Sequence, residues 1–125
     1  MPGFSKETAS NVGQFGPVTD RHEEIDGYTV TIASFAAEID GAPLLKGLKD
    51  DLCQCPHWGY VVKGTATFTF ADHVERFDAG DAFYLPAGHS PAHGADSELV
   101  LFSPTRELRE TEEAMQRNMA AMQSG

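Results

Sequence analysis

The stretch HWGYVVKGTATFTF, residues 57–70, decides the fold class. In its second half, residues 65–70, threonines alternate with alanine and phenylalanine, which indicates a β-strand with one buried face. Its first half, residues 57–63, is rich in aromatic and β-branched residues and also favours a strand. Gly64 separates the two runs, and we expect it to form the tight turn of a β-hairpin.

Further short strands are expected on both sides of this hairpin. Residues 27–35 alternate valine and isoleucine with threonine, and residues 74–77 follow a short turn and pair as a second hairpin strand. Two more strands are expected at 82–86 and 98–103, with a glycine- and proline-containing loop over 87–97 between them. No helical pattern separates the strands, so the sequence predicts an antiparallel sandwich or barrel.

The last part of the chain, by contrast, is expected to be helical. Residues 105–122 have a strongly helical composition, and Ser103 and Pro104 suit the N-cap and the first helical position. A narrow apolar stripe follows the helix, formed by Leu108, Met115, Met119 and Met122. This stripe packs either on the chain's own barrel or on a partner subunit, and the sequence leaves both alternatives open.

The length of 125 residues is enough for one domain with one core. We therefore expect a flexible N-terminal segment over 1–17, a β-barrel over 18–103 and a helix over 104–125. The formal net charge of −10 argues against a nucleic-acid or anionic-membrane partner, because phosphate contacts need clustered Lys and Arg.

The start of the chain lacks the basic and apolar runs of a secretory signal, and no stretch is apolar enough to span a membrane. The two cysteines, Cys53 and Cys55, are two residues apart, so a disulfide between them would close a strained, very small loop. These features predict a cytoplasmic protein with reduced thiols.

The segment GDAFYLPAGHSPAH, residues 80–93, resembles the second conserved motif of the cupins. That motif reads Gly, five residues, Pro, one residue, Gly, two residues and His, and here Gly80, Pro86 and Gly88 are in register. The position of the motif's histidine is occupied by Pro91, with a histidine two residues before it and another two residues after it. The resemblance covers about residues 28–103 and implies an all-β, jelly-roll β-barrel with the helix added at its C-terminus.

The stretch CQCPHWGY, residues 53–60, resembles a variant of the first cupin motif. Gly64 matches the glycine that ends the family motif. Counting back from it, His57 falls in the position of the motif's glutamate and Cys53 in that of its second histidine, while Asp51 falls in that of its first. Because the family's metal ligands project inward from these two motifs, the resemblance implies a metal site with changed ligand types.

The candidate metal ligands are Cys53, Cys55, His57, His89 and His93. Alternate residues of a straight strand lie about 6.5 Å apart, whereas donors on one zinc ion must lie within roughly 4 Å of each other. A shared ion therefore requires a bent strand, which Pro56 and Gly59 permit. The competing interpretation is that the thiols and the imidazoles are simply buried parts of the core.

Thiolate and imidazole donors without a carboxylate favour zinc as the divalent metal. Three functions stay open. The first is a metal-dependent enzyme that acts on a small polar molecule inside the barrel, and the second is a non-catalytic cupin that binds or senses a metal or small ligand. The third is a structural barrel whose helix forms a homodimer. The sequence contains no nucleophile elbow and no phosphate-binding glycine loop.

Overall fold

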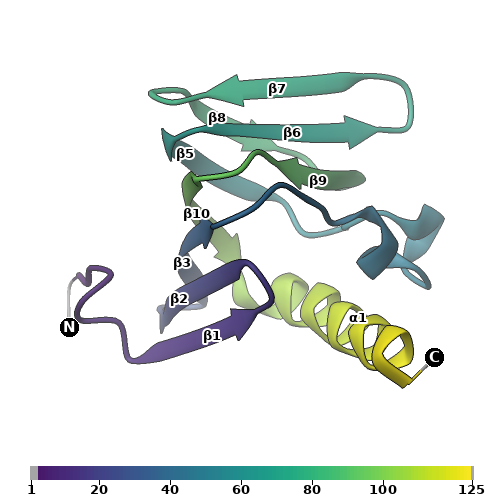
Figure 1. Cartoon of the computed structure of the whole chain (residues 1–125), viewed down its shortest axis with the longest axis horizontal. Helices are drawn as coiled ribbons and strands as arrows, with labels where there is room; N and C mark the ends of the chain where they lie inside the picture. Colours follow the sequence, from purple (N-terminus) through teal and green to yellow (C-terminus); the bar gives the residue numbers. More distant parts are fainter. Residues whose placement is uncertain (1–2, 125) are drawn as a thin grey trace.

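The computed structural model describes residues 3–124 as two antiparallel sheets and a C-terminal helix (Figure 1). The larger sheet has six strands, in the order β1 (Asn11–Phe15), β2 (Val18–Ile25), β3 (Tyr28–Phe35), β10 (Ser97–Pro104), β5 (His57–Lys63) and β8 (Ala82–Leu85). The smaller has four, in the order β4 (Ile39–Asp40), β9 (His89–His93), β6 (Thr65–Phe70) and β7 (Val74–Asp78). Two short 3₁₀ turns, η1 (Ala42–Leu45) and η2 (Lys49–Asp51), precede β5, and the helix α1 spans Thr105–Ser124.

The hydrophobic core lies between the two sheets, because the alternating strands direct one set of side chains inward. Phe35, Val61, Phe83 and Leu99 come from the larger sheet, and Phe68 comes from the smaller. This arrangement confirms the predicted all-β jelly-roll class with a C-terminal helix. The barrel itself is not closed, because the backbone hydrogen bonds of the described strands stay within each sheet and the sheets meet through side chains.

The predicted hairpin at Gly64 is wrong. Strands β5 and β6 belong to different sheets, so the chain crosses from one sheet to the other at this glycine. Gly64 has a φ of +76°, and a Cβ placed on it would lie 2.6 Å from the Cα of Ser97. The glycine therefore lets the chain pass close to β10 as it crosses from one sheet to the other. The second predicted hairpin is confirmed, because β6 and β7 pair as antiparallel neighbours.

Two segments that were expected to lack strands contain them. Residues 11–15, inside the segment that we expected to be flexible, form β1 and pair with β2 at the edge of the larger sheet. Residues 89–93, inside a predicted loop, form β9 between β4 and β6. Met1 and Pro2 of the N-terminal segment, and Gly125 of the C-terminal one, lie outside the described residues.

Helix α1 packs on its own chain through part of the predicted apolar stripe. Leu108 and Met115 contact a small buried cluster formed by Leu45, Cys53 and Cys55. The side-chain amide of Asn118 donates to the carbonyl oxygens of Leu44 and Lys46, at 2.7 and 2.9 Å, and ties the helix to the segment around η1.

Within residues 3–124, no helix has both the length and the apolar character needed to cross a membrane.

Candidate metal centre

Cys53, His57 and His89 form a buried cluster where the two sequence motifs meet. The backbone N–H of Cys53 donates to the carbonyl of His89 at 2.7 Å, and the N–H of Gly88 donates to the carbonyl of Cys53 at 2.8 Å. These hydrogen bonds join the segment before β5 to the start of β9. Cys53 and His89 are thus held side by side by their own backbone.

The spacing of the donor atoms suits a small cation. One donor atom from each of the three residues lies within 4.8 Å of the other two, and the Sγ of Cys53 is 3.9 Å from the Nε2 of His57. Sulfur and nitrogen ligands on one tetrahedral zinc ion lie about 3.4 to 3.6 Å apart. Small rotations of these side chains would close the difference. The geometric difficulty of a straight strand does not arise, because β5 begins only at His57.

Hydrogen bonds at the opposite ring nitrogens orient both imidazoles. The Nδ1 of His89 is 2.9 Å from the carbonyl oxygen of Pro86, which can only accept, so this nitrogen carries the proton and Nε2 keeps its lone pair. The Nδ1 of His57 is 2.6 Å from the Oγ of Ser103. Metal-binding histidines commonly have such a partner, which fixes the tautomer and the ring direction. Ser103, which we expected to cap the helix, instead makes this contact.

Several solved structures are similar in fold to this chain. An RmlC-like cupin from Shewanella frigidimarina is 17% identical, with a TM-score of 0.59 over 83% of this chain and 91% of that chain. KdgF from a Halomonas species is 18% identical, with a TM-score of 0.56 over 81% and 93%. A mutant of the Bacillus subtilis oxalate decarboxylase OxdC is 16% identical, with a TM-score of 0.61 over 81% of this chain and 28% of that longer one.

This chain has the cupin fold. At this level of identity the likeness establishes the fold, and it confirms the cupin-type fold that the resemblance at Gly80, Pro86 and Gly88 implied. The sequence matches no protein-family profile, and no curated protein is similar to it in sequence.

The interior of the protein keeps both imidazoles neutral. Burial, aided by the neighbouring His89, lowers the pKa of His57 to about 3, and burial also lowers the pKa of His89. Burial raises the pKa of the Cys53 thiol, opposed by the hydroxyl of Thr111, whose Oγ1 is 3.4 Å from the sulfur. The histidines are therefore in their metal-binding form, whereas Cys53 must release a proton when it binds a cation.

Cys55, a predicted ligand, lies outside the cluster that the structure brings together. Its Sγ is 4.0 Å from the Nδ1 of His57, the ring nitrogen that faces Ser103 and not the one that faces Cys53. Burial, followed by the nearby Cys53 and the glutamates of α1, raises its pKa to about 12. Both cysteines are free thiols, as expected from the sequence.

His93, the other predicted ligand, also lies apart from the cluster. It is at the far end of β9 from His89, and its ring stacks on that of Phe35 with the centroids 4.3 Å apart. Its Nδ1 is buried without a hydrogen-bond partner among the described residues, and burial lowers its pKa to about 4. His93 is thus placed in the aromatic core.

Sequence reasoning did not identify Ser103 and Thr111 as neighbours of the candidate centre. Ser103 fits an N-cap as well as it fits a histidine partner, so its type gives no signal. Thr111 is brought to Cys53 only because α1 folds back over the small cluster, which no local pattern predicts.

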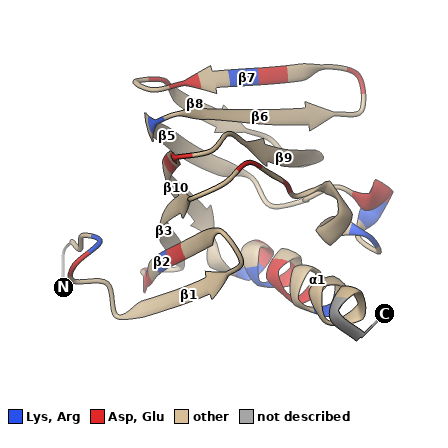
Figure 2. Ribbon diagram, viewed as in Figure 1, with Lys and Arg blue, Asp and Glu red and all other residues tan. Residues whose placement is uncertain are grey.

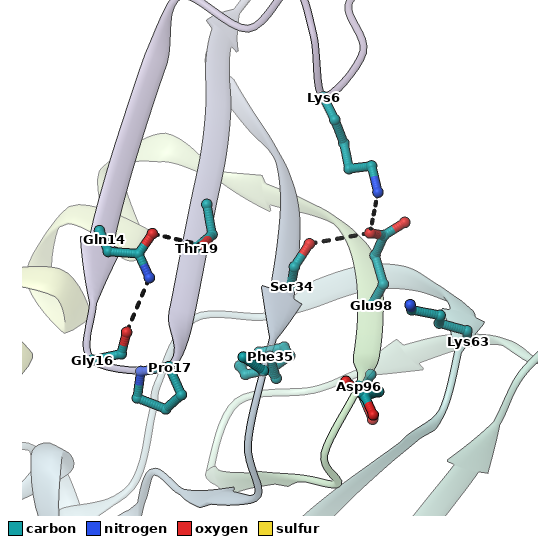
Figure 3. Close-up of a pocket in the computed structure, with 12 residues that line it drawn as sticks. Lys6, Gln14, Gly16, Pro17, Thr19, Ser34, Phe35, Lys63, Asp96 and Glu98 are labelled. Carbon is teal, nitrogen blue, oxygen red and sulfur yellow. Dashed lines mark hydrogen bonds and ion pairs between the residues drawn. The ribbon is translucent and has the colours of Figure 1, made fainter.

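The two hollows described in the structure do not contain the cluster. One, of about 270 Å³, lies between the N-terminal segment and β10, where the Nζ of Lys6 is 2.8 Å from the Oε1 of Glu98 and the Oγ of Ser34 is 3.1 Å from the same oxygen (Figure 3). The other lies on the outer face of the larger sheet, around Trp58 and Tyr84. The three donor residues are 1 to 7% exposed, so the centre is enclosed by the fold.

Proposed function

We propose that this protein is a metal-binding cupin in which Cys53, His57 and His89 hold one divalent cation. The observation that carries the proposal is the convergence of one sulfur and two imidazole nitrogens within 4.8 Å of each other in a buried position. The contacts at both Nδ1 atoms strengthen it, because they leave each Nε2 free for a ligand bond.

Zinc is the metal that this donor set favours. Cysteine and histidine are the usual zinc ligands in proteins, and no carboxylate belongs to the cluster. Three protein ligands leave a fourth position for water or a small molecule. A zinc ion held by these ligands would act as a Lewis acid toward the molecule in that position. The hydroxyl of Thr111 beside the sulfur would support the thiolate form of Cys53.

Two functions follow from a site with three protein ligands. In the first, the protein is an enzyme that acts on a small polar molecule inside the sandwich, and among the structural neighbours OxdC is named as an oxalate decarboxylase. In the second, the protein binds or senses a metal or a small ligand without catalysis. The enclosure of the donors favours the second function, because a substrate needs access to the open position.

The test is a metal analysis of protein purified without a chelating tag. We expect about one zinc ion per chain, and zinc-edge X-ray absorption should show one sulfur and two imidazole nitrogens in the first shell. Cys53→Ser should lose most of the bound zinc, as should His89→Gln. Cys55→Ser is the matched control, because it removes the same thiol two residues away and should leave zinc binding unchanged.

Two results would overturn the assignment. The first is a Cys53→Ser variant that keeps the zinc content of the parent protein. The second is a first shell with two sulfurs that loses one of them in Cys55→Ser, which would bring Cys55 into the centre.

The enzymatic and the non-catalytic functions are separated by access to the metal. Cobalt-substituted protein should show a thiolate-to-cobalt charge-transfer band in the near ultraviolet. If addition of azide changes the visible spectrum, a fourth position is open to solvent and the enzyme is favoured. If the spectrum is unchanged, the position is closed and the non-catalytic function stands.

A further inference from the structure

The outer face of the larger sheet carries two rows of apolar side chains that cross four strands. Register places Tyr84, Trp58, Phe102 and Val30 opposite one another in one row. The same pairing gives a second row of Ala82, Tyr60, Val100 and Ile32. These residues alternate with the buried core positions of the same strands, so they point away from the sandwich. We call them the aromatic face.

The aromatic face is exposed to solvent although its side chains are apolar. Its four aromatic members are between 44 and 61% exposed, with Trp58 at the upper end. Fully buried, each would cover about 150 to 250 Å², so half-exposed they offer on the order of 400 Å². Tyr28, which is 51% exposed beyond Val30 on β3, extends the surface toward 500 Å². A standard interface buries about 800 Å² on each partner, so this face provides most of one.

The distribution of charge also favours the aromatic face as a binding surface. The chain has a formal net charge of −10, yet neither row includes a charged residue. Figure 2 shows β8 without charged positions and β5 with one at its end, whereas α1 and β7 carry several. Arg21 and Glu23 adjoin the rows at their β2 end and are opposite in sign. Two chains of such net charge repel each other, and a neutral face is where they can meet at the lowest electrostatic cost.

The face also has the shape of a surface that pairs with itself. Trp58 stands beside a hollow of about 300 Å³ lined by Gly59, Tyr60, Tyr84 and Phe102. A two-fold interface uses the same patch on both subunits, so one patch must supply both the projection and the recess. The lining residues bring no charged group to hold a polar ligand, which argues for an apolar side chain as the occupant.

We propose that the aromatic face binds a second copy of this chain and forms a two-fold dimer. The alternative dimer surface, the apolar stripe of α1, is partly used within the subunit, because Leu108 and Met115 pack against the small buried cluster. The dimer is therefore formed sheet to sheet. It does not depend on the metal centre, whose donors point to the inside of the sandwich.

The single tryptophan of the chain makes the proposal directly testable. In a dimer Trp58 is buried, and its fluorescence should be blue-shifted at high protein concentration. Serial dilution should shift the emission to the red with the same midpoint that sedimentation velocity gives for the change from dimer to monomer. A monomer at every concentration overturns the proposal. So does a blue-shifted emission in a monomer, which would mean that something else covers the face.

Variants locate the interface. Tyr84→Glu would place two negative charges, one from each subunit, close to the two-fold axis. Phe102→Arg would replace an apolar contact by a positive charge, so the two variants test the face with charges of opposite sign. Each should weaken dimerisation by at least about 30-fold, the effect of losing one central interface residue. Val74→Glu is the control, because Val74 is a similarly exposed apolar residue on β7 of the other sheet. Circular dichroism establishes that each variant is folded, and a dimer that survives both face variants overturns the assignment.

Discussion

Two thiols only two residues apart have different surroundings in this protein. Cys53 faces the Nε2 of His57 and the hydroxyl of Thr111. Cys55 faces the other ring nitrogen and the carbonyl oxygens of Pro56 and Pro104. The resemblance to the family motif already distinguished the two cysteines, because only Cys53 falls in a ligand position of that motif. The ring nitrogen that each sulfur meets could not be predicted, since it depends on the rotamer of His57.

The burial of His93 leads to a prediction about how the stability of the protein depends on pH. Burial lowers its pKa from 6.5 to about 4, so between these values the unfolded chain binds a proton that the folded protein does not. The unfolded state is then favoured, and the free energy of unfolding falls as the pH is lowered from about 6.5 toward 4. The largest loss from this residue is about 3 kcal/mol.

We expect His93→Phe to remove this part of the acid sensitivity. A phenyl ring keeps the stacking on Phe35 and removes the unpaired Nδ1, so stability at pH 7 should be equal or higher. Urea unfolding of both proteins at several pH values between 7 and 4.5 measures the effect. His57 contributes with the same sign in both proteins and cancels in the comparison. Parallel curves for the two proteins would contradict the prediction.

At the scale of elements, the crossing at Gly64 decides how the sheets are connected. Gly64→Ala would add the cost of a left-handed backbone, about 1 to 2 kcal/mol, and a Cβ that clashes with Ser97 of β10. We therefore expect a loss in the free energy of unfolding of more than about 2 kcal/mol. Chemical unfolding followed by circular dichroism measures it.

Gly80→Ala is the matched control for this substitution. Gly80 has a φ of +95°, but a Cβ placed there meets nothing within 4 Å. It should therefore show the backbone cost alone and lose less stability than Gly64→Ala. If the two variants were equally destabilised, the close approach of β10 would have no energetic consequence.

The elements that the sequence predicted well are those with clear alternation. Strands β3, β6 and β10 lie close to the predicted 27–35, 65–70 and 98–103. Strand β9 was missed because Pro91 and the flanking glycines favour a loop. Pro91 still belongs to the sheet, because its carbonyl oxygen accepts from the N–H of Gly41 at 2.8 Å. Pairing of this kind depends on distant segments and leaves no local pattern.

At the scale of the whole molecule, the proposed metal centre borders the main core. That core is made by apolar side chains from both sheets, and of the three proposed ligands His89 packs against it, with its ring centroid 5.8 Å from that of Phe68. Because the core is built from apolar packing, removal of zinc by a chelator should lower the melting temperature and leave the protein folded. At a free zinc concentration 1,000-fold above its dissociation constant, the bound ion stabilises the fold by about 4 kcal/mol. Thermal unfolding followed by circular dichroism, with and without chelator, measures the change.

The cysteine variants give the controls for this experiment. Cys55→Ser should show the same chelator-dependent change as the parent protein, and Cys53→Ser should show little or none. Complete unfolding on chelation would mean that the centre is required for folding and would contradict this prediction.

The architecture as a whole was predictable because it depends on patterns that repeat along the chain. The connection between the sheets was not, because a glycine in a left-handed conformation fits a hairpin and a crossing equally well. The convergence of the donors could not be predicted from local pattern, since Cys53 and His89 are far apart in the sequence and meet through backbone pairing.

The backbone hydrogen bonds between Cys53 and the segment Gly88–His89 have a consequence for the dynamics of metal exchange. In the proposed centre, backbone pairing already holds Cys53 and His89 side by side, so an ion would enter or leave through side-chain rotation and local opening, with no refolding step. Occupancy of the centre would then follow the free concentration of its metal.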